Sequence, residues 1–175
     1  TRNVIHTAHE FIQLKALQRG NCDGIFIHPV VGKKKTGDYK SAYIIKSYEI
    51  MQKMFYPENK ILFGVFSTYS RYAGAKEALF TALCRKNYGC SHFIIGRDHT
   101  GVNGPGNTAY DPTEIINQFK DLGIEIIQFN EVYYSKSKQK HIEDNNNGTV
   151  SEEDKMFISG TEARQLLRDY KSPPT

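Results

Sequence analysis

Cysteine is scarce in this 175-residue chain: it occurs only as Cys22, Cys84 and Cys90. An odd number of cysteines without paired spacing does not suit a disulfide framework and is typical of a reducing compartment, so we expect a cytoplasmic protein. No Cys-x-x-Cys pair occurs, which argues against a cysteine-rich zinc site. We therefore expect no metal ion held by protein ligands.

Long apolar runs are also missing. No run approaches the ~20 residues that a membrane helix needs, and the mean hydropathy is −0.54, so we expect no membrane-spanning segment. The sequence does not open with a cationic and apolar leader, and nothing in it argues for export.

Apolar material for a packed core is nevertheless ample. Hydrophobic residues make up 39% of the chain, with 10 Phe and 11 Tyr, which excludes disorder of the whole chain. The length corresponds to one domain at about 150 residues per domain, with room for a small appendage. The 23 basic and 19 acidic residues give a net charge of +4, which fits an anionic small ligand as well as nucleic acid.

Helical and strand patterns alternate along the chain. Apolar spacing, helix caps and short β-branched runs bounded by Gly or Pro mark the elements. The expected helices cover residues 5–19, 39–56, 74–88, 111–123 and 159–169, and the expected strands cover 24–29, 61–66, 92–95 and 124–129. Such an alternation predicts an α/β fold with a doubly wound, Rossmann-like parallel sheet, whose ligands bind beyond the carboxyl ends of the strands.

The first βα unit lacks its strand, because the sequence opens directly into a helix. We expect that this first strand is missing from these residues, that they are part of a longer polypeptide, and that the isolated segment is poorly folded or inactive. We divide the chain into the first part of a catalytic domain (1–130), a polar loop or insertion rich in Lys, Asn, Asp and Ser (131–155), and the C-terminal helix segment of the same domain (156–175).

Three clusters could carry chemistry. The first holds Arg2, whose planar fork matches tetrahedral oxyanions, with His6 and His9 on one face of a helix start. The alternative is two ordinary surface or half-buried histidines beside an arginine. The second cluster, residues 96–101, follows a strand end, which is where parallel sheets bind ligands. It could equally be a polar turn with an internal ion pair. The third, residues 159–164, could bind phosphate or simply cap a helix.

The order of these motifs resembles the ATP sulfurylase (sulfate adenylyltransferase) family of the nucleotidylyltransferase superfamily, over nearly the whole chain. Thr1-Arg2-Asn3 with His6-x-x-His9 is similar to the family's Q-x-R-N-x-x-H-x-x-H segment. Other matching segments are His28-Pro29-Val30-Val31-Gly32, Arg71-Tyr72-Ala73-Gly74, Arg85 to His99 (RKNYGCSHFIIGRDH), and Ile158-Ser159-Gly160-Thr161 with Arg164.

The resemblance implies an enzyme that joins ATP and sulfate to give adenosine 5′-phosphosulfate and pyrophosphate, or runs the reverse reaction, with Mg²⁺ on the nucleotide. It implies a catalytic segment Thr1, Arg2 and Asn3, with Arg2 and Thr100 at sulfate. The implied ATP-binding residues are Arg2, Asn3, His6, His9, Gly96, Arg97, Asp98, His99 and Val132. We also expect a homo-oligomer.

This sequence departs from the family pattern in several places. Val4 replaces a proline, and Thr100 replaces a small residue near sulfate, usually alanine, where a larger hydroxylated side chain could alter the anion fit. Tyr134-Ser135-Lys136-Ser137 stands where some prokaryotic members carry metal-binding cysteines, so that zinc feature looks absent. The family's glutamine before Thr1 and its N-terminal β-rich domain are outside this sequence.

Other classes of function stay open at this point. A sister nucleotidylyltransferase acting on a phosphorylated small molecule would share the paired histidines, and a non-catalytic nucleotide- or anion-binding module would share the fold. The lysine runs at 33–35 and at 136, 138 and 140 could suggest nucleic acid, but short runs of this kind are typical of solvated loops. We therefore expect no nucleic-acid partner.

Overall fold

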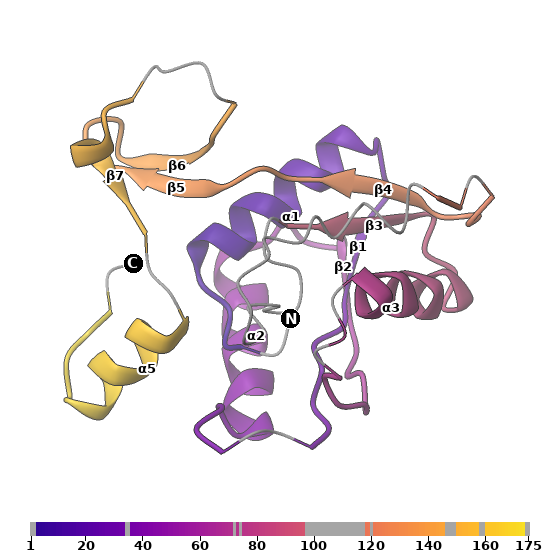
Figure 1. Cartoon of the computed structure of the whole chain (residues 1–175), viewed down its shortest axis with the longest axis horizontal. Coiled ribbons are helices and arrows are strands. Elements are labelled where there is room, and N and C mark those ends of the chain that lie inside the picture. The colour runs from indigo at the N-terminus through magenta and orange to yellow at the C-terminus, as the bar shows by residue number, and fades with distance from the viewer. Residues whose placement is uncertain are drawn as a thin grey trace.

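The computed structural model describes residues 3–33, 36–71, 73, 75–96, 118–119, 121–145, 150–157 and 160–173. Its elements follow the expected alternation (Figure 1). In chain order they are α1 (Thr7–Arg19), β1 (Ile25–Ile27), α2 (Ser41–Phe55), β2 (Ile61–Phe63), α3 (Ala75–Asn87), β3 (His92–Ile95), β4 (Glu125–Gln128), β5 (Val132–Ser135), β6 (Lys140–Glu143), the short 3-10 helix η1 (Glu152–Asp154), β7 (Lys155–Met156) and α5 (Gly160–Arg168). The helix expected over 111–123 lies mostly outside the described residues.

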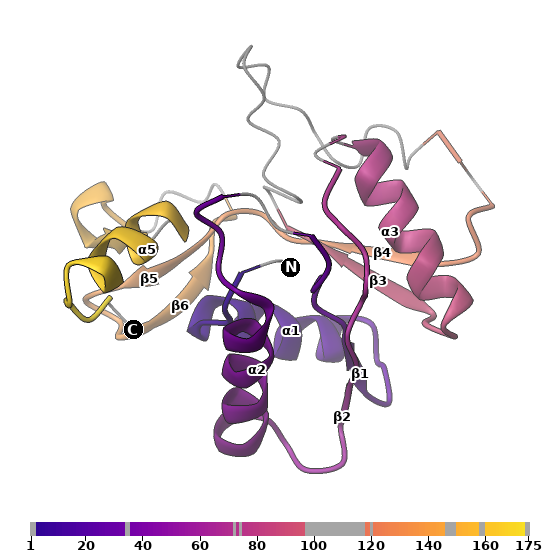
Figure 2. The same ribbon diagram turned by 90° about the horizontal axis from the view of Figure 1, so that it is seen from below.

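Two pairs of parallel strands confirm the α/β class. Strand β1 pairs with β2, Ile25 opposite Ile61, and β3 pairs with β4, His92 opposite Glu125. Helix α2 makes the crossover between β1 and β2, and α3 connects β2 to β3. Figure 2 shows that α3 lies at one end of the molecule, while α5 and the β5–β6 strands lie at the other.

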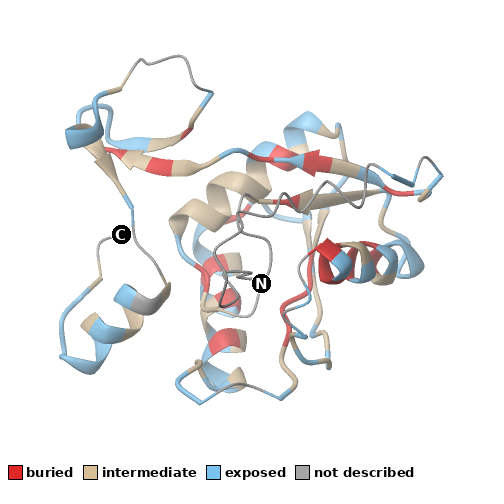
Figure 3. Cartoon of the chain, in the orientation of Figure 1, coloured by how far each residue is buried: buried red, intermediate tan, exposed pale blue. Residues whose placement is uncertain are grey.

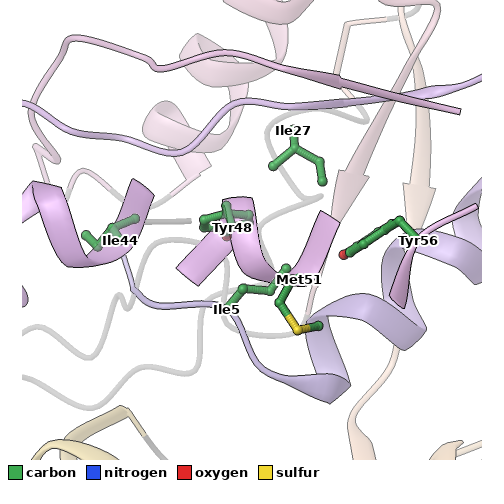
Figure 4. Packing of buried hydrophobic residues seen from close by; sticks show 6 residues of the cluster. All are labelled: Ile5, Ile27, Ile44, Tyr48, Met51 and Tyr56. Carbon is green, nitrogen blue, oxygen red and sulfur yellow. The ribbon is translucent and has the colours of Figure 1, made fainter. Parts of the chain in front are cut away.

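The main core cluster joins the start of the chain to α2 and β1. Its buried members are Ile5, Ile27, Ile44, Tyr48, Met51 and Tyr56 (Figure 4). The spacing of Ile44, Tyr48 and Met51 along α2 predicts one buried face, and the structure confirms it. Because Ile5 immediately precedes His6, this cluster also anchors the turn that carries the first histidine.

Figure 3 shows buried and exposed positions along both α2 and α3. Three local predictions about these helices are wrong. The apolar spacing of the sequence predicts Phe55 on the buried face of α2 and Leu83 on that of α3, but their exposed fractions are 46% and 38%. Phe55 is the last residue of its helix, and α3 turns Glu77, Thr81 and Arg85 inward instead. The sequence also predicts Asp38 as the cap of the helix expected over 39–56, but α2 begins two residues later, at Ser41, with Lys40 at the N-cap.

The stretch expected to be a polar loop or insertion forms a small antiparallel sheet over much of its length. Strand β5 pairs with β6 and with β7. Hydrogen bonds to Ser135 hold it in place: Ser135 Oγ donates to Asp154 Oδ2 (2.5 Å), nineteen residues away, and the backbone N–H of Lys138 donates to Ser135 Oγ (3.1 Å). Tyr133, 4% exposed, gives this sheet a buried side chain, so polar composition did not prevent a defined structure.

Candidate active site

One cavity of about 1350 Å³ collects the expected site residues that the structure describes. Asn3, His6, His9, Gly96 and Val132 all line it, although they come from the chain start, the end of β3 and the start of β5. Six further expected site residues lie outside the described part of the chain: Thr1, Arg2, Arg97, Asp98, His99 and Thr100. The roles of all eleven stay predictions.

The start of α1 forms one wall of the cavity. His6 is the N-cap residue, with extended backbone angles, and its carbonyl oxygen accepts hydrogen bonds from the backbone N–H groups of His9 (2.9 Å) and Glu10 (3.3 Å). The rings of His6 and His9 lie 4.0 Å apart between centroids. Thr7 and Ala8 also line the cavity, so the positive end of the helix dipole faces it.

Both histidines are uncharged near neutral pH. Desolvation, followed by the nearby His141, lowers the pKa of His6 to about 4. Burial, with His6 beside it, holds the pKa of His9 well below its usual value. The Nδ1 atom of His9 is buried and has no hydrogen-bond partner within the described part of the chain. Two neutral imidazoles with spare hydrogen-bonding capacity suit an anionic ligand that supplies acceptors.

Stability should fall in acid because of these histidines. The unfolded chain takes up a proton on His6 near pH 6.5, whereas the folded chain does so only near pH 4. The unfolded state therefore binds more protons in this interval, and the free energy of unfolding decreases as the pH falls through it. Urea unfolding of the complete protein at about pH 7.5 and about pH 5 measures the slope. His6→Gln should flatten it, and an unchanged slope would show that His6 titrates normally.

The start of α5 meets the start of the chain at this cavity. A Cβ atom added to Gly160 would lie 3.3 Å from Asn3 Nδ2 and 3.5 Å from Arg164 Nη1. Arg164 also lies over the Tyr39 ring, 5.8 Å from its centroid, and lines the cavity. The first and third expected clusters are therefore brought together; Ser159 lies outside the described residues. Any side chain at position 160 would crowd Asn3.

Two residues quoted from the family motifs, without an expected role, also line the cavity. Arg85, 8% exposed, donates from Nη2 to the carbonyl oxygen of His28 (2.7 Å), and its guanidinium lies 4.2 Å from the Phe66 ring centroid. Arg85 Nη1 and His28 Nδ1 are both buried without a hydrogen-bond partner among the described residues. Unsatisfied buried polar atoms are costly, so they indicate that a polar group fills the adjacent space.

His141 is a cavity residue that sequence reasoning missed. It lies on β6 opposite Tyr134 and lines the same cavity as His6 and His9. The only sequence signal was two short stretches of aromatic and β-branched residues, 132–135 and 140–143, around a four-residue turn. Their polar surroundings favoured a loop.

Among the described residues, no group of three or more His, Cys, Asp or Glu side chains lies where it could hold a metal ion. In the same part of the chain, no helix is long and apolar enough to span a bilayer.

Known proteins resemble this chain along its whole length. The family model described as ATP-sulfurylase matches residues 1–175. A sulfate adenylyltransferase from Halothermothrix orenii is 44% identical, covering 99% of this chain and 45% of the relative. Another, from Synechocystis sp., is 43% identical, covering 99% of this chain and 44% of the relative. The chain thus spans less than half the length of these relatives.

A solved structure agrees on the fold. A hexameric APS kinase from Thiobacillus denitrificans superposes with a TM-score of 0.71 at 20% identity, covering 99% of this chain and 32% of that one. The family model and the curated relatives together decide the family. This chain belongs to the ATP-sulfurylase family.

Proposed function

We propose that the protein containing this chain is a sulfate adenylyltransferase, which converts ATP and sulfate to adenosine 5′-phosphosulfate and pyrophosphate, or runs the reverse reaction. The observation that carries the proposal is the single cavity lined by Asn3, His6, His9, Gly96 and Val132. The relatives that are 44% and 43% identical to this chain bear the same name, which supports the proposal.

The reaction needs positioning and charge stabilisation and no protein nucleophile. A sulfate oxygen attacks the α-phosphorus of ATP, a new P–O bond forms, the bond to the β-phosphate oxygen breaks, and pyrophosphate leaves. His6 and His9 hold the phosphates through ring N–H groups, and the start of α1 adds its dipole. Arg2 and Thr100 bind sulfate, Arg97 to His99 hold the nucleoside with Gly96, and Val132 packs against adenine.

Magnesium belongs to the substrate in this proposal. Mg²⁺ keeps several waters and binds phosphate oxygens with few protein ligands. The chain's part in that mode would be to hold the phosphates, for which the imidazoles of His6 and His9 and the start of α1 line the cavity. The ion would arrive on ATP and reduce the repulsion between the two anions.

We also propose that the complete sheet is doubly wound, with a further parallel strand between β1 and β3. Among the described strands, β1 has only β2 as a neighbour and β3 only β4. Residues 25–29, in and just after β1, and residues 92–94 of β3 line the same cavity. Arg85 lines it too, and the buried Nη1 atom of Arg85 and Nδ1 atom of His28 have no hydrogen-bond partner among the described residues. A peptide strand from outside residues 1–175 would supply polar partners. Hydrogen exchange on the complete protein should find both strands strongly protected; fast exchange would contradict this.

The assembly, the location and the partners of the protein are further parts of the proposal. One solved relative is described as hexameric, so we propose a homo-oligomer, which light scattering tests. We further propose a cytoplasmic enzyme that binds no nucleic acid, to be checked by cell fractionation and by an RNA-binding titration at low salt.

Sulfate-dependent turnover of ATP tests the proposed function. The complete protein should release pyrophosphate only when ATP and sulfate are both present, and should make ATP from adenosine 5′-phosphosulfate and pyrophosphate. Residues 1–175 alone should be inactive.

His6→Ala and His9→Ala should each raise KM for ATP and slow turnover, with little change in Tm. Pyrophosphate release without sulfate, or no turnover by the complete protein, would reject the proposal.

A further inference from the structure

His141 lies where a third imidazole could reach the ligand of His6 and His9. Its strand, β6, runs beside α1 in both views (Figures 1 and 2). The His141 ring lies 6.1 Å from the Phe11 ring of α1 and 5.4 Å, edge to face, from the Tyr134 ring of β5. These two contacts fix the ring on the face of the β5–β6 sheet that meets α1.

An ion pair between a buried carboxylate and a partly exposed arginine holds this sheet against the helix. Glu143, two residues after His141 and therefore on the same face of β6, pairs with Arg19 at the end of α1. Glu143 Oε1 also accepts the backbone N–H of Asn130 (3.1 Å), and Arg19 lies 4.3 Å from the Phe129 ring centroid. Because Glu143 is 8% exposed, the pair sets the position of β6 relative to α1.

The His141 ring is half-buried and lines the cavity together with His6 and His9. Electrostatic repulsion between the two imidazoles contributes to the lowered pKa of His6, and burial lowers the pKa of His141 itself. The charged and titratable groups on the elements around it are His6 at the N-cap of α1, His9, Glu10, Lys15 and Arg19 on α1, Tyr133 and Tyr134 on β5, and Lys140 and Glu143 on β6. Of the two carboxylates, Glu143 pairs with Arg19, and Glu10 acts on Tyr56.

We propose that His141 binds the phosphates of the nucleotide together with His6 and His9, as a further positioning residue of this site. The inference rests on the proposed function for the identity of the ligand. A polyphosphate brought to three neutral imidazoles supplies acceptors for their ring N–H groups, and its negative charge favours their protonated form. Binding is then coupled to proton uptake, so affinity falls as the pH rises.

Calorimetry with inorganic pyrophosphate tests this on the complete protein. Titrations in two buffers of different ionisation enthalpy give both Kd and the number of protons taken up. His141→Phe keeps the ring contacts with Phe11 and Tyr134 but has no nitrogen. We expect its Kd to rise about tenfold, as for a hydrogen bond to a charged group, and its proton uptake to decrease. His141→Gln keeps one N–H donor, so its Kd should change less while its proton uptake falls equally.

Lys140→Gln is the matched control. It removes a full positive charge from the adjacent, exposed position of the same strand and should leave Kd and proton uptake unchanged. If His141→Phe and His141→Gln both bind pyrophosphate as the wild type does, His141 only packs the sheet and the inference is wrong. A Kd that rises equally in Lys140→Gln also overturns it, because general charge would then explain the effect.

The outcome separates this inference from the proposed function. Normal sulfate-dependent turnover with unaltered binding in the His141 variants rejects the inference alone. Pyrophosphate binding that depends on His141, in a protein without sulfate-dependent turnover, supports the inference and rejects the proposed reaction. A wild-type protein that binds no pyrophosphate rejects both.

Discussion

Arg2→Ala is expected to lower sulfate-dependent turnover by about 10²–10³-fold, equivalent to ~3–4 kcal/mol of barrier, as for loss of one transition-state donor. Arg2 lies outside the described residues; its neighbour Asn3 lines the cavity and lies beside Gly160. Arg2→Lys should restore little, because an ammonium group lacks the bidentate fork. Steady-state kinetics of pyrophosphate release measure both effects.

Arg168→Ala provides the matched control for Arg2. Arg168 is an exposed arginine at the end of α5, and its loss removes the same charge from the protein. Turnover should stay close to wild type, and all three variants should keep the wild-type Tm. Near-normal turnover in Arg2→Ala would mean that the family motif does not carry its usual chemistry here.

Ile44→Ala is expected to lower the free energy of unfolding by about 3 kcal/mol, within the usual range for truncating a buried isoleucine. The Ile44 side chain is 0% exposed and packs in the cluster with Ile5 and Tyr48 (Figure 4). Deleting its outer carbons leaves a cavity that neighbouring side chains fill only in part. Urea unfolding of the complete protein measures the loss, and activity per folded molecule should remain.

Ile50→Ala serves as the comparison on the same helix. Ile50 is 45% exposed, so its truncation should change the free energy of unfolding by less than about 0.5 kcal/mol. Equal losses in Ile44→Ala and Ile50→Ala would contradict the observed burial of α2. A loss of activity per folded molecule in Ile44→Ala would show that the core also positions His6 through Ile5.

Elements whose pattern is local could be predicted from the sequence. The strand at 92–95 has the observed bounds, and Gly89 ends α3 in a left-handed conformation (φ +92°), as its position after the apolar spacing indicates. The paired histidines were likewise found because His6 and His9 are three residues apart at a helix start. In each case, the determining interactions lie within a few residues of the signal.

Features set by distant contacts could not be predicted. The β5–β6 strands depend on Ser135 and Asp154, nineteen residues apart, and on Arg19 of α1. His141 approaches the site only because this sheet packs on α1, and no spacing in the sequence encodes that contact. The prediction that Phe55 is buried is wrong because helix periodicity indicates which face of a helix is apolar but not where along the helix the packing against the core ends.

The local nature of the β5–β6 connection has a consequence for the order of folding. Strands joined by the turn at 136–139 pair as a hairpin within about 1–10 μs, whereas Ile25 meets Ile61, and His92 meets Glu125, only after long crossovers have ordered. The hairpin bearing Val132 and His141 can therefore pair first, and it gains the contacts with Asp154 and Arg19 that stabilise it later. A chain in which the hairpin has formed but the parallel strands have not yet paired exposes unpaired strand edges. Intermolecular association therefore competes with the last step of folding.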